Sequence, residues 1–475
     1  MTELSQQLGR MATLDDISDV ELDQISRDGF DLVWLLGIWQ TGDSARKVST
    51  TKPEWREEFQ RTLPDLTDVD ICGSCFAIRE YTVHADFGGD DALARFRERL
   101  RLRDIGLILD FVPNHVAPDH RWLREHPDYF IQGTERSLAE QPKNYGRFDT
   151  PQGSTILAYG RDPYFDGWPD TVQLNYGNAA LQDAMIDVLL SISRKCDGVR
   201  CDMAMLVMPE VFERTWGIDA EPFWSKATEV VRASVPGFLF MAEIYWDLEW
   251  AILQQGFDYA YDKRLYDRLI HGDATMVRSH MAADLLYQDH LVRFLENHDE
   301  PRAAATFPVE QHKAAAIITF LSPGLRFIHQ GQRTGKTTRI PVHLRRGPDE
   351  RADPRISEFY TLLIEALRDP SFKRGSWSLV ATRSAWEGNH SNEAFIVYVW
   401  DDVDSERRLV VVNYSDHDSQ CYAPIPWNET GQELMRFQDT MGPAVYDREL
   451  VDLRQRGLYL DLPPWGYHVF KCVAP

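Results

Sequence analysis

The sequence has few cysteines, an excess of acidic over basic residues, and no long apolar run. Six cysteines among 475 residues are too few for a disulfide framework and fit a reducing compartment. Fifty-one Lys and Arg against 74 Asp and Glu give a formal net charge of −23. This charge argues against nucleic acid or an anionic membrane as a partner, because both are bound by basic patches. No apolar run approaches the length of a membrane span, so we expect a soluble protein.

The first residues of the chain also lack the basic and apolar regions of a signal peptide. We therefore expect the protein to stay in the cytoplasm. Three sequences match glycosylation sequons, at Asn389, Asn413 and Asn428, and they carry little weight without secretion.

Two short motifs point to chemistry that the rest of the chain does not support. Residues 72–75 contain two cysteines at half-zinc spacing, but no second pair accompanies them, so an incidental pair is the better interpretation. The stretch of residues 331–337 is one residue short of a phosphate-binding loop, and no mononucleotide fold surrounds it.

The composition is that of a globular protein. With 43% hydrophobic and 12% aromatic residues, the chain can bury a large core. Its length suits one large domain with a smaller one. Apolar residues at helical spacing predict helices over residues 15–28, 179–195 and 220–233.

A short apolar strand ends in Arg200 and Asp202. Side chains alternate along a strand with period two, so these two point to the same face. The guanidinium would then hold the carboxylate ionised and fixed in direction. For this motif alone, a structural ion pair is the simpler interpretation.

Three further apolar runs end in acidic or histidine side chains. Residues 106–115 end with Asp110, Asn114 and His115, residues 238–243 end with Glu243, and residues 291–299 end with Asn297, His298 and Asp299. Helix-length segments separate the four runs. Such a pattern predicts a parallel barrel with its active site at the carboxyl ends of the strands.

In order and spacing, these four stretches resemble the four signature regions of the α-amylase superfamily, glycoside hydrolase family 13. Residues 172–175 resemble a fifth signature. The resemblance covers about residues 12–475 and is closest to α-glucosidase-like members with a short domain B. Four ordered motifs are together highly specific. The resemblance implies an α/β fold, a TIM-type (β/α)8 barrel, and retaining glycosidase chemistry.

A retaining glycosidase needs two carboxyl groups about 5 Å apart, one as nucleophile and one as acid and then base. Asp202, beside Arg200, is suited to stay ionised, as a nucleophile must. Glu243 ends an apolar strand with no cation next to it in the sequence, so we expect a raised pKa, which suits a general acid. The family assigns the same roles to the matching positions.

The resemblance also assigns residues that would bind the substrate. Asp299 matches the third family acid, and His115 and His298 match histidines that bind sugar hydroxyls. Asp110 and Arg302 are expected to support the same subsite. A structural role would be the better interpretation of either histidine alone, but both lie within motifs.

One substrate-binding position departs from the family pattern. Where family members usually have a Tyr followed by an Asp, this chain has Phe76 and Ala77. Stacking on the sugar can survive this change, but the hydrogen bonds to its distal hydroxyls cannot. The alternative is that this loop is misaligned by a residue or two.

The resemblance implies three domains. The barrel would comprise residues 1–115 and 179–375, the domain B excursion residues 116–178, and a C-terminal antiparallel β-sandwich residues 376–475. The excursion is short, rich in Pro, Gly and aromatic residues, and without clear periodicity. Residues 1–12 lack the apolar run of a first barrel strand, so we expect seven regular strands. The gap would be open, filled by residues 1–12, or completed by sequence upstream.

The expected function is a retaining α-glycosidase that acts on a short α-glucoside or small oligosaccharide. One alternative is an α-glucosyl transferase or phosphorylase on the same scaffold, and another is a catalytically silent sugar-binding protein. No cofactor is expected. Asn114 matches a calcium ligand of some amylases, but calcium is often absent from members with a short excursion, so no metal is predicted. The sequence does not indicate an oligomeric state.

Overall fold

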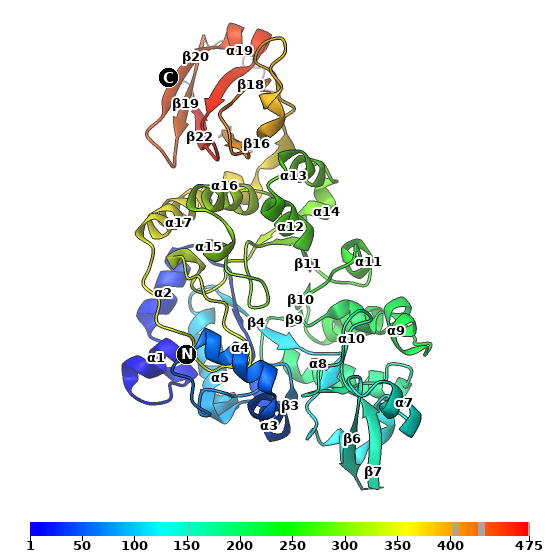
Figure 1. Cartoon of the computed structure of the whole chain (residues 1–475). Coiled ribbons are helices and arrows are strands. Elements are labelled where there is room, and N and C mark those ends of the chain that lie inside the picture. Colours follow the sequence, from blue (N-terminus) through cyan, green and yellow to red (C-terminus); the bar gives the residue numbers. More distant parts are fainter. Residues whose placement is uncertain (152, 402–406, 426–432, 474–475) are drawn as a thin grey trace. The chain divides into compact units, whose positions relative to one another are not determined.

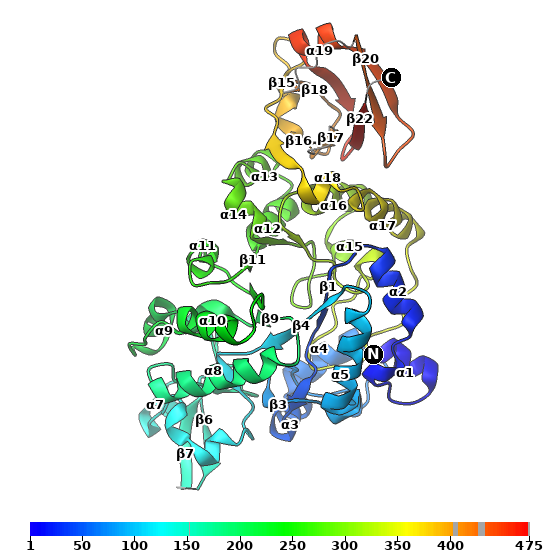
Figure 2. The same cartoon turned by 180° about the vertical axis from the view of Figure 1, so that it is seen from behind.

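The computed structural model describes residues 1–151, 153–401, 407–425 and 433–473. The chain forms two compact units, Met1–Tyr261 with Ile340–Pro348, and Asp262–Arg339 with Asp349–Pro475 (Figures 1 and 2). These two units are defined by which segments pack together. The domain boundaries expected from the sequence instead separate the barrel, the excursion and the sandwich. Those domain boundaries remain a prediction.

Five parallel strands form the sheet of the first unit, in the order β1-β4-β9-β10-β11. Their bounds are Leu32–Leu35, Gly106–Phe111, Gly198–Cys201, Leu239–Ala242 and Tyr259–Tyr261. Nearly all residues of β4, β9 and β10 are buried. Parallel strands covered on both faces are continuous apolar runs, which is why the sequence could place them.

The helices of the first unit begin where the sequence supplies capping residues. Helix α2 (Asp19–Arg27) has a capping box between Ser18 and Glu21, and α8 (Ala179–Ser193) begins after Asn178, whose side chain accepts from the N–H of Ala180. Helices α5 (Gly89–Arg101) and α10 (Phe223–Ser234) are buried along one face. The helices expected over residues 15–28, 179–195 and 220–233 are present.

Residues 1–12 contain a helix, α1 (Thr2–Leu8), and do not supply a barrel strand. The parallel strands of the two units number seven within the described residues, as expected. Helix α1 ends at Gly9, whose φ of 64° lies in the left-handed region that favours glycine.

The excursion contains regular elements although its sequence has no clear periodicity. Strand β5 (His115–Val116) pairs antiparallel with β8 (Val172–Gln173), which closes the base of the excursion. Between them, β6 (Tyr145–Thr150) pairs antiparallel with β7 (Gly153–Ala158), and both lie beside α7 (Glu135–Glu140) in Figure 1. Such short elements leave only a weak periodic signal in the sequence.

The second unit contains the last two parallel strands, β12 (Leu291–Arg293) and β13 (Leu325–Arg326). Its core gathers apolar side chains from helices, which are α12 (Lys263–His271), α13 (Ala274–Met281), α16 (Val309–Phe320) and α17 (Pro354–Leu367). Side chains of the following sheet, such as Ile396 and Val410, extend this core.

The C-terminal part of the second unit is the expected antiparallel β-sandwich. A six-stranded sheet has the order β14-β16-β17-β22-β19-β20, and a three-stranded sheet has the order β15-β18-β21. Val397, Leu409 and Leu460 belong to one core between the two sheets. The strands are β14 (Ser376–Leu379), β15 (Arg383–Ser384), β16 (Phe395–Asp401), β17 (Arg407–Asn413), β18 (Ser419–Ala423), β19 (Leu434–Asp439), β20 (Val445–Glu449), β21 (Leu458–Leu462) and β22 (Tyr467–Val473). Across the described ranges, no helix has the length and apolarity needed to span a membrane.

Candidate active site

Arg200 joins two carboxylates at the carboxyl ends of β9 and β10. Its Nη1 lies 2.6 Å from Oδ1 of Asp202, and its Nη2 lies 2.7 Å from Oε2 of Glu243. Arg200 is fully buried, and Asp202 and Glu243 are 6% and 3% exposed. The same-face geometry expected for Arg200 and Asp202 is present. One guanidinium therefore holds two buried carboxylates close together.

A third carboxylate, Asp110, lies on the neighbouring strand. Asp110 on β4 is the register partner of Arg200 on β9, and the Oδ1 to Nη1 distance is 3.8 Å. The indole N–H of Trp34 and the backbone N–H of Gly37 also donate to Asp110, at 3.2 and 2.7 Å. These donors compensate the burial of its charge.

Aromatic rings surround the Arg200 guanidinium. The rings of Trp34, Phe76 and Tyr261 lie 5.3, 5.3 and 5.8 Å from its central carbon. Burial by itself would lower the pKa of Arg200, but the neighbouring Glu243 and other anionic groups outweigh it, and the pKa is raised. Phe76 thus belongs to the same cluster as the candidate catalytic carboxylates.

Glu243 receives more donors than its sequence context indicates. Besides Arg200, the hydroxyl of Tyr245 donates to Oε1 at 2.7 Å, and the backbone N–H of Met203 donates to Oε2 at 2.7 Å. Met203 has a φ of 42°, which is strained for a residue with a side chain. No cation lies next to Glu243 in the sequence, but the fold brings Arg200 against it, so the argument from sequence neighbours for a raised pKa does not hold. These donors favour the ionised carboxylate.

His115 is buried at the base of the excursion. It is 4% exposed, and burial lowers its pKa to about 3, so its ring is neutral at physiological pH. The Trp168 ring lies 5.2 Å from the His115 ring, between centroids. A neutral imidazole can donate one hydrogen bond and accept another, as sugar hydroxyls require.

The Asn114 side chain takes part in a hydrogen bond at the base of the excursion. Its Oδ1 accepts a hydrogen bond from Nε2 of Gln173 at 2.9 Å, so its side-chain oxygen is already engaged. Among the residues that the structure describes, no group of three His, Cys, Asp or Glu could hold a metal ion.

His298 and Asp299 lie in the second unit, beyond β12. Nε2 of His298 is 3.0 Å from Oδ2 of Asp299, and the Asp299 side chain is 45% exposed. Oδ1 of Asn297 accepts from the N–H groups of Asp299 and Glu300, at 2.9 and 2.8 Å. Asn297 therefore fixes the turn that carries Asp299.

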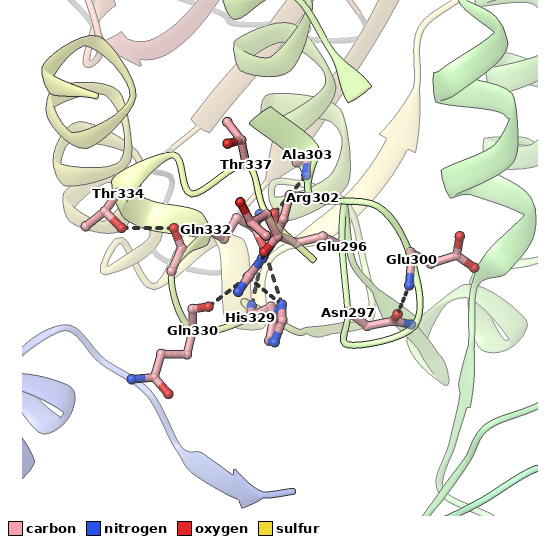
Figure 3. Close-up of polar contacts among 12 residues, drawn as sticks. Glu296, Asn297, Glu300, Arg302, Ala303, His329, Gln330, Gln332, Thr334 and Thr337 are labelled. Carbon is pink, nitrogen blue, oxygen red and sulfur yellow. Dashed lines mark hydrogen bonds and ion pairs between the residues drawn. The ribbon is translucent and has the colours of Figure 1, made fainter. Parts of the chain in front are cut away.

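An ion pair closes the loop that carries these residues (Figure 3). Oε1 of the fully buried Glu296 lies 2.5 Å from Nη1 of Arg302, and Oε2 accepts from the N–H of Ala303 at 2.8 Å. Nδ1 of His329 lies 3.1 Å from Glu296 and 2.8 Å from Arg302. Arg302 is 5% exposed and is engaged in this network. Glu296 and Arg302 thus clamp the loop of residues 297–301 at its two ends.

Sequence reasoning missed several members of these clusters. Tyr245 and Tyr261 were not singled out, although both lie within or just after recognised strand ends. Glu296 lies inside the 291–299 stretch, whose pattern assigns it no role. Its three hydrogen-bond partners come from residues later in the chain, so no local pattern could identify it.

Comparisons with known proteins identify the family. A family model described as "Alpha amylase, catalytic domain" matches residues 29–429. Alpha-amylase 3 of Dictyoglomus thermophilum is 22% identical over 307 residues, which are 60% of this chain and 58% of that protein. The trehalose synthase/amylase TreS of Mycobacterium tuberculosis is 28% identical over 206 residues, 38% of this chain and 32% of that one. The chain thus spans less than three fifths of the length of these curated relatives.

A solved structure gives the same fold. The crystal structure of the maltogenic α-amylase AmyB from Thermotoga neapolitana superposes with a TM-score of 0.67 at 20% identity, over 96% of this chain and 94% of that one. At this identity the likeness establishes the fold alone. Together with the family model, which covers most of the sequence, it leads to one conclusion: the chain belongs to the α-amylase family.

Proposed function

We propose that the protein is a retaining α-glycosidase that hydrolyses short α-glucosides through a covalent glycosyl-enzyme. The observation that carries the proposal is the bridge from Arg200 to both Asp202 and Glu243. Two carboxylates held by one guanidinium are close neighbours, and retaining glycosidases use a separation of about 5 Å. An inverting enzyme keeps its two carboxyl groups further apart to admit a water molecule.

In the first step, Asp202 attacks the anomeric carbon. Its carboxylate forms a bond to that carbon while the glycosidic C–O bond breaks, and Glu243 gives its proton to the leaving oxygen. In the second step, Glu243 takes a proton from water, and the water oxygen displaces Asp202. Arg200 supports this cycle because it keeps Asp202 ionised and directs its Oδ1.

Glu243 must carry a proton before it can act as the acid. In the free protein, Arg200, Tyr245 and the Met203 N–H all donate to it, which favours the ionised form. We infer that a bound substrate weakens one of these bonds. Tyr245 is the suitable partner, because its hydroxyl can turn from Glu243 to the leaving-group oxygen while Arg200 stays buried.

Three further residues are candidates for sugar binding. We propose that Asp299 and His298 bind hydroxyl groups of the attacked sugar. We propose that His115 does the same from the base of the excursion. Arg302 would act indirectly, because its guanidinium bonds to Glu296 and to the backbone of Gln330. It would position the loop that carries Asp299.

The proposed substrate is a disaccharide or a glucosylated small molecule. The excursion of residues 116–178 is short, and its aromatic and proline residues favour a closed pocket over a long groove. Phe76 packs on Arg200 and offers no hydrogen bond to a sugar hydroxyl. Starch should therefore be a poor substrate. We keep the cytoplasm as the proposed compartment.

Two other functions remain as alternatives. Transfer to a sugar, a small acceptor or phosphate proceeds through the same covalent intermediate as hydrolysis. The reactions differ only in the molecule that attacks this intermediate. The printed names of relatives include a trehalose synthase/amylase and a maltosyltransferase, which supports keeping this alternative. A silent sugar-binding protein is disfavoured because Asp202, Glu243 and Asp299 are all present.

Release of reducing sugar from a panel of α-glucosides, with and without phosphate, tests the proposal. Hydrolysis predicts release of glucose that is independent of phosphate. Release only with phosphate would indicate a phosphorylase, and binding without release a silent protein. Comparing kcat/KM on maltose and on amylose tests the substrate size. A clear preference for amylose would contradict the proposed closed pocket.

A further inference from the structure

The clamp of Glu296 and Arg302 engages only one of the two ring nitrogens of His329. Nδ1 lies 2.8 Å from Nη1 of Arg302 and 3.1 Å from Oε1 of Glu296 (Figure 3). Across the parts of the chain that the structure describes, no other group forms a hydrogen bond with the His329 ring. Each ring nitrogen of a histidine can form a hydrogen bond, so Nε2 is still available for one.

Nε2 lies on the accessible edge of the ring. The His329 side chain is 22% exposed, whereas the side chains of Glu296 and Arg302 are 0% and 5% exposed. Nδ1 contacts these two buried groups, so the edge that carries Nε2 is the one that points out of the clamp. A ligand can therefore reach Nε2 without breaking the contacts of Nδ1.

The backbone of His329 is held in place as well. Its N–H donates to Oε1 of Gln332 at 3.3 Å, and Nε2 of Gln332 donates to the Tyr360 hydroxyl at 2.7 Å. The same hydroxyl lies 3.0 Å from Nε2 of His312. Gln332, Tyr360 and His312 are all buried. This chain of hydrogen bonds fixes His329 before any ligand binds, and a fixed group loses little conformational entropy on binding.

The His329 ring is neutral at physiological pH. Burial lowers the pKa of His329, although the hydrogen bond with Glu296 opposes this shift. A neutral imidazole has one N–H donor and one acceptor nitrogen, so Nε2 takes the role that Nδ1 does not. A sugar hydroxyl can donate and accept, whereas an ammonium group only donates and a carboxylate only accepts. The nitrogen therefore suits a neutral hydroxylated ligand in either tautomer of the ring.

His329 borders the loop that would bind the sugar. Its two partners, Glu296 and Arg302, stand directly before and after the loop of residues 297–301. His298, in that loop, is near enough for its charge to affect the pKa of His329. The accessible nitrogen of His329 thus belongs to the same cluster as the residues proposed to hold sugar hydroxyls.

We propose that Nε2 of His329 forms a hydrogen bond with a hydroxyl group of the attacked sugar. His329 is then a substrate-binding residue as well as a member of the clamp. This inference rests on the proposed function, because it takes the loop of residues 297–301 as part of the sugar site. The ligand class is a neutral hexose. The side chains of Phe76 and Ala77 cannot form hydrogen bonds with its hydroxyls, so recognition of the ring depends on groups such as this nitrogen.

Two substitutions separate the bond to the sugar from the contacts of the clamp. The amide of glutamine can take the place of Nε2, and the shorter amide of asparagine that of Nδ1. Calorimetry measures the binding of methyl α-glucoside and of its monodeoxy analogues without turnover. For the wild-type protein, we expect removal of the bonded hydroxyl to weaken binding by roughly fivefold or more. This loss should disappear in His329→Asn, with the losses at other positions unchanged, and should remain in His329→Gln.

Equal losses in the wild-type protein and in His329→Asn for every deoxy analogue would overturn the inference, because His329 would then act only through the clamp. Absence of methyl α-glucoside binding to the wild-type protein would overturn it too. Thermal unfolding verifies that both variants fold. If the losses differ as expected but the wild-type protein cleaves no α-glucoside, the proposed function fails and the hydrogen bond stands. If it cleaves α-glucosides and the losses are equal, only the inference fails.

A second measurement needs no variant for its outcome. In the wild-type protein labelled with 15N-histidine, methyl α-glucoside should shift the Nε2 resonance of His329, which is assigned by its absence from the spectrum of His329→Gln. The analogue that lacks the bonded hydroxyl should shift it much less. The same shift with every analogue, or no shift with any, would contradict a direct hydrogen bond.

Discussion

Arg200 bonds to Glu243 across 43 residues of sequence, with 2.7 Å between Nη2 and Oε2. The contact arises because β9 and β10 pair in parallel, with Arg200 opposite Met241 in the register. The carboxyl ends of both strands therefore lie at the same edge of the sheet. A residue two positions beyond Met241 then comes within reach of the long Arg200 side chain.

Replacing Asp202 and replacing Glu243 should affect activity differently when the leaving group of the substrate is changed. We expect Asp202→Asn to lower kcat on every substrate by a thousandfold or more, as loss of a nucleophile does. Glu243→Gln should lose comparable activity on maltose but less on α-glucosyl fluoride, because fluoride leaves without a proton. Steady-state kinetics on both substrates provides the measurement, with circular dichroism to verify folding. A tenth of the wild-type activity on maltose in either variant would remove its assignment.

Arg200 should be required for stability as well as activity. It is fully buried against Asp202, Glu243 and, at 3.8 Å, Asp110. Arg200→Met would leave buried carboxylates without their cation, which costs about 3–5 kcal/mol. Urea unfolding at pH 7 checks this. Replacing Arg101, an exposed arginine paired with Glu98, should leave the free energy of unfolding nearly unchanged. Equal losses for the two variants would show that the Arg200 bridge stabilises the fold no more than a surface ion pair does.

The Glu296 clamp should affect catalysis through the position of Asp299. Glu296→Gln removes the charge that pairs with Arg302, and we expect kcat to fall at least tenfold with little change in KM, because a small misplacement of a catalytic group is costly. Glu300→Gln is the control, since Glu300 is on the same loop and pairs with Lys263 instead. If both variants lower kcat equally, the loop is sensitive to any change and the clamp has no particular role.

Buried histidines should make the protein less stable in mild acid. Burial lowers the pKa of His115 and His120 to about 3, and that of His312 and His343 to about 4. Below pH 6.5 the unfolded chain binds protons at these sites while the folded chain does not, so stability falls as the pH drops towards 4. Each group contributes about 1.4 kcal/mol per pH unit at most.

Urea unfolding midpoints between pH 7.5 and pH 4.5 measure this slope. His343→Gln should make the slope shallower, because it removes one of the four groups. Nδ1 of His343 lies 3.0 Å from the Ser49 hydroxyl, a contact that glutamine can partly replace. An unchanged slope in this variant would contradict the neutral state of His343.

The parallel strands and the site residues at their ends could be predicted from the sequence, because parallel barrel strands are buried apolar runs that end in polar residues. The runs that end at Asp110, Asp202 and Glu243 become β4, β9 and β10. The charge environment of Glu243 was not predictable from neighbouring residues. Arg200 reaches it only through the pairing of two strands, which local sequence does not encode.

The excursion and the loop clamp were also beyond sequence reasoning. The hairpin of β6 and β7 consists of six-residue strands with mixed burial, whose alternation is too short to stand out. The partners of Glu296 are Arg302, Ala303 and His329. Helix α16 and strand β13 lie between Ala303 and His329 in the chain. Such a network becomes visible only in three dimensions.

The most direct test of the account is to trap the covalent intermediate. A fluorinated α-glucosyl fluoride that forms the glycosyl-enzyme quickly and hydrolyses slowly would be incubated with the protein, and mass spectrometry of its peptides would locate the added sugar. We predict one glucosyl group, on the peptide that contains Asp202, and none in Asp202→Asn. A label on another carboxylate, or turnover of the reagent with inversion and no label, would contradict the proposed mechanism.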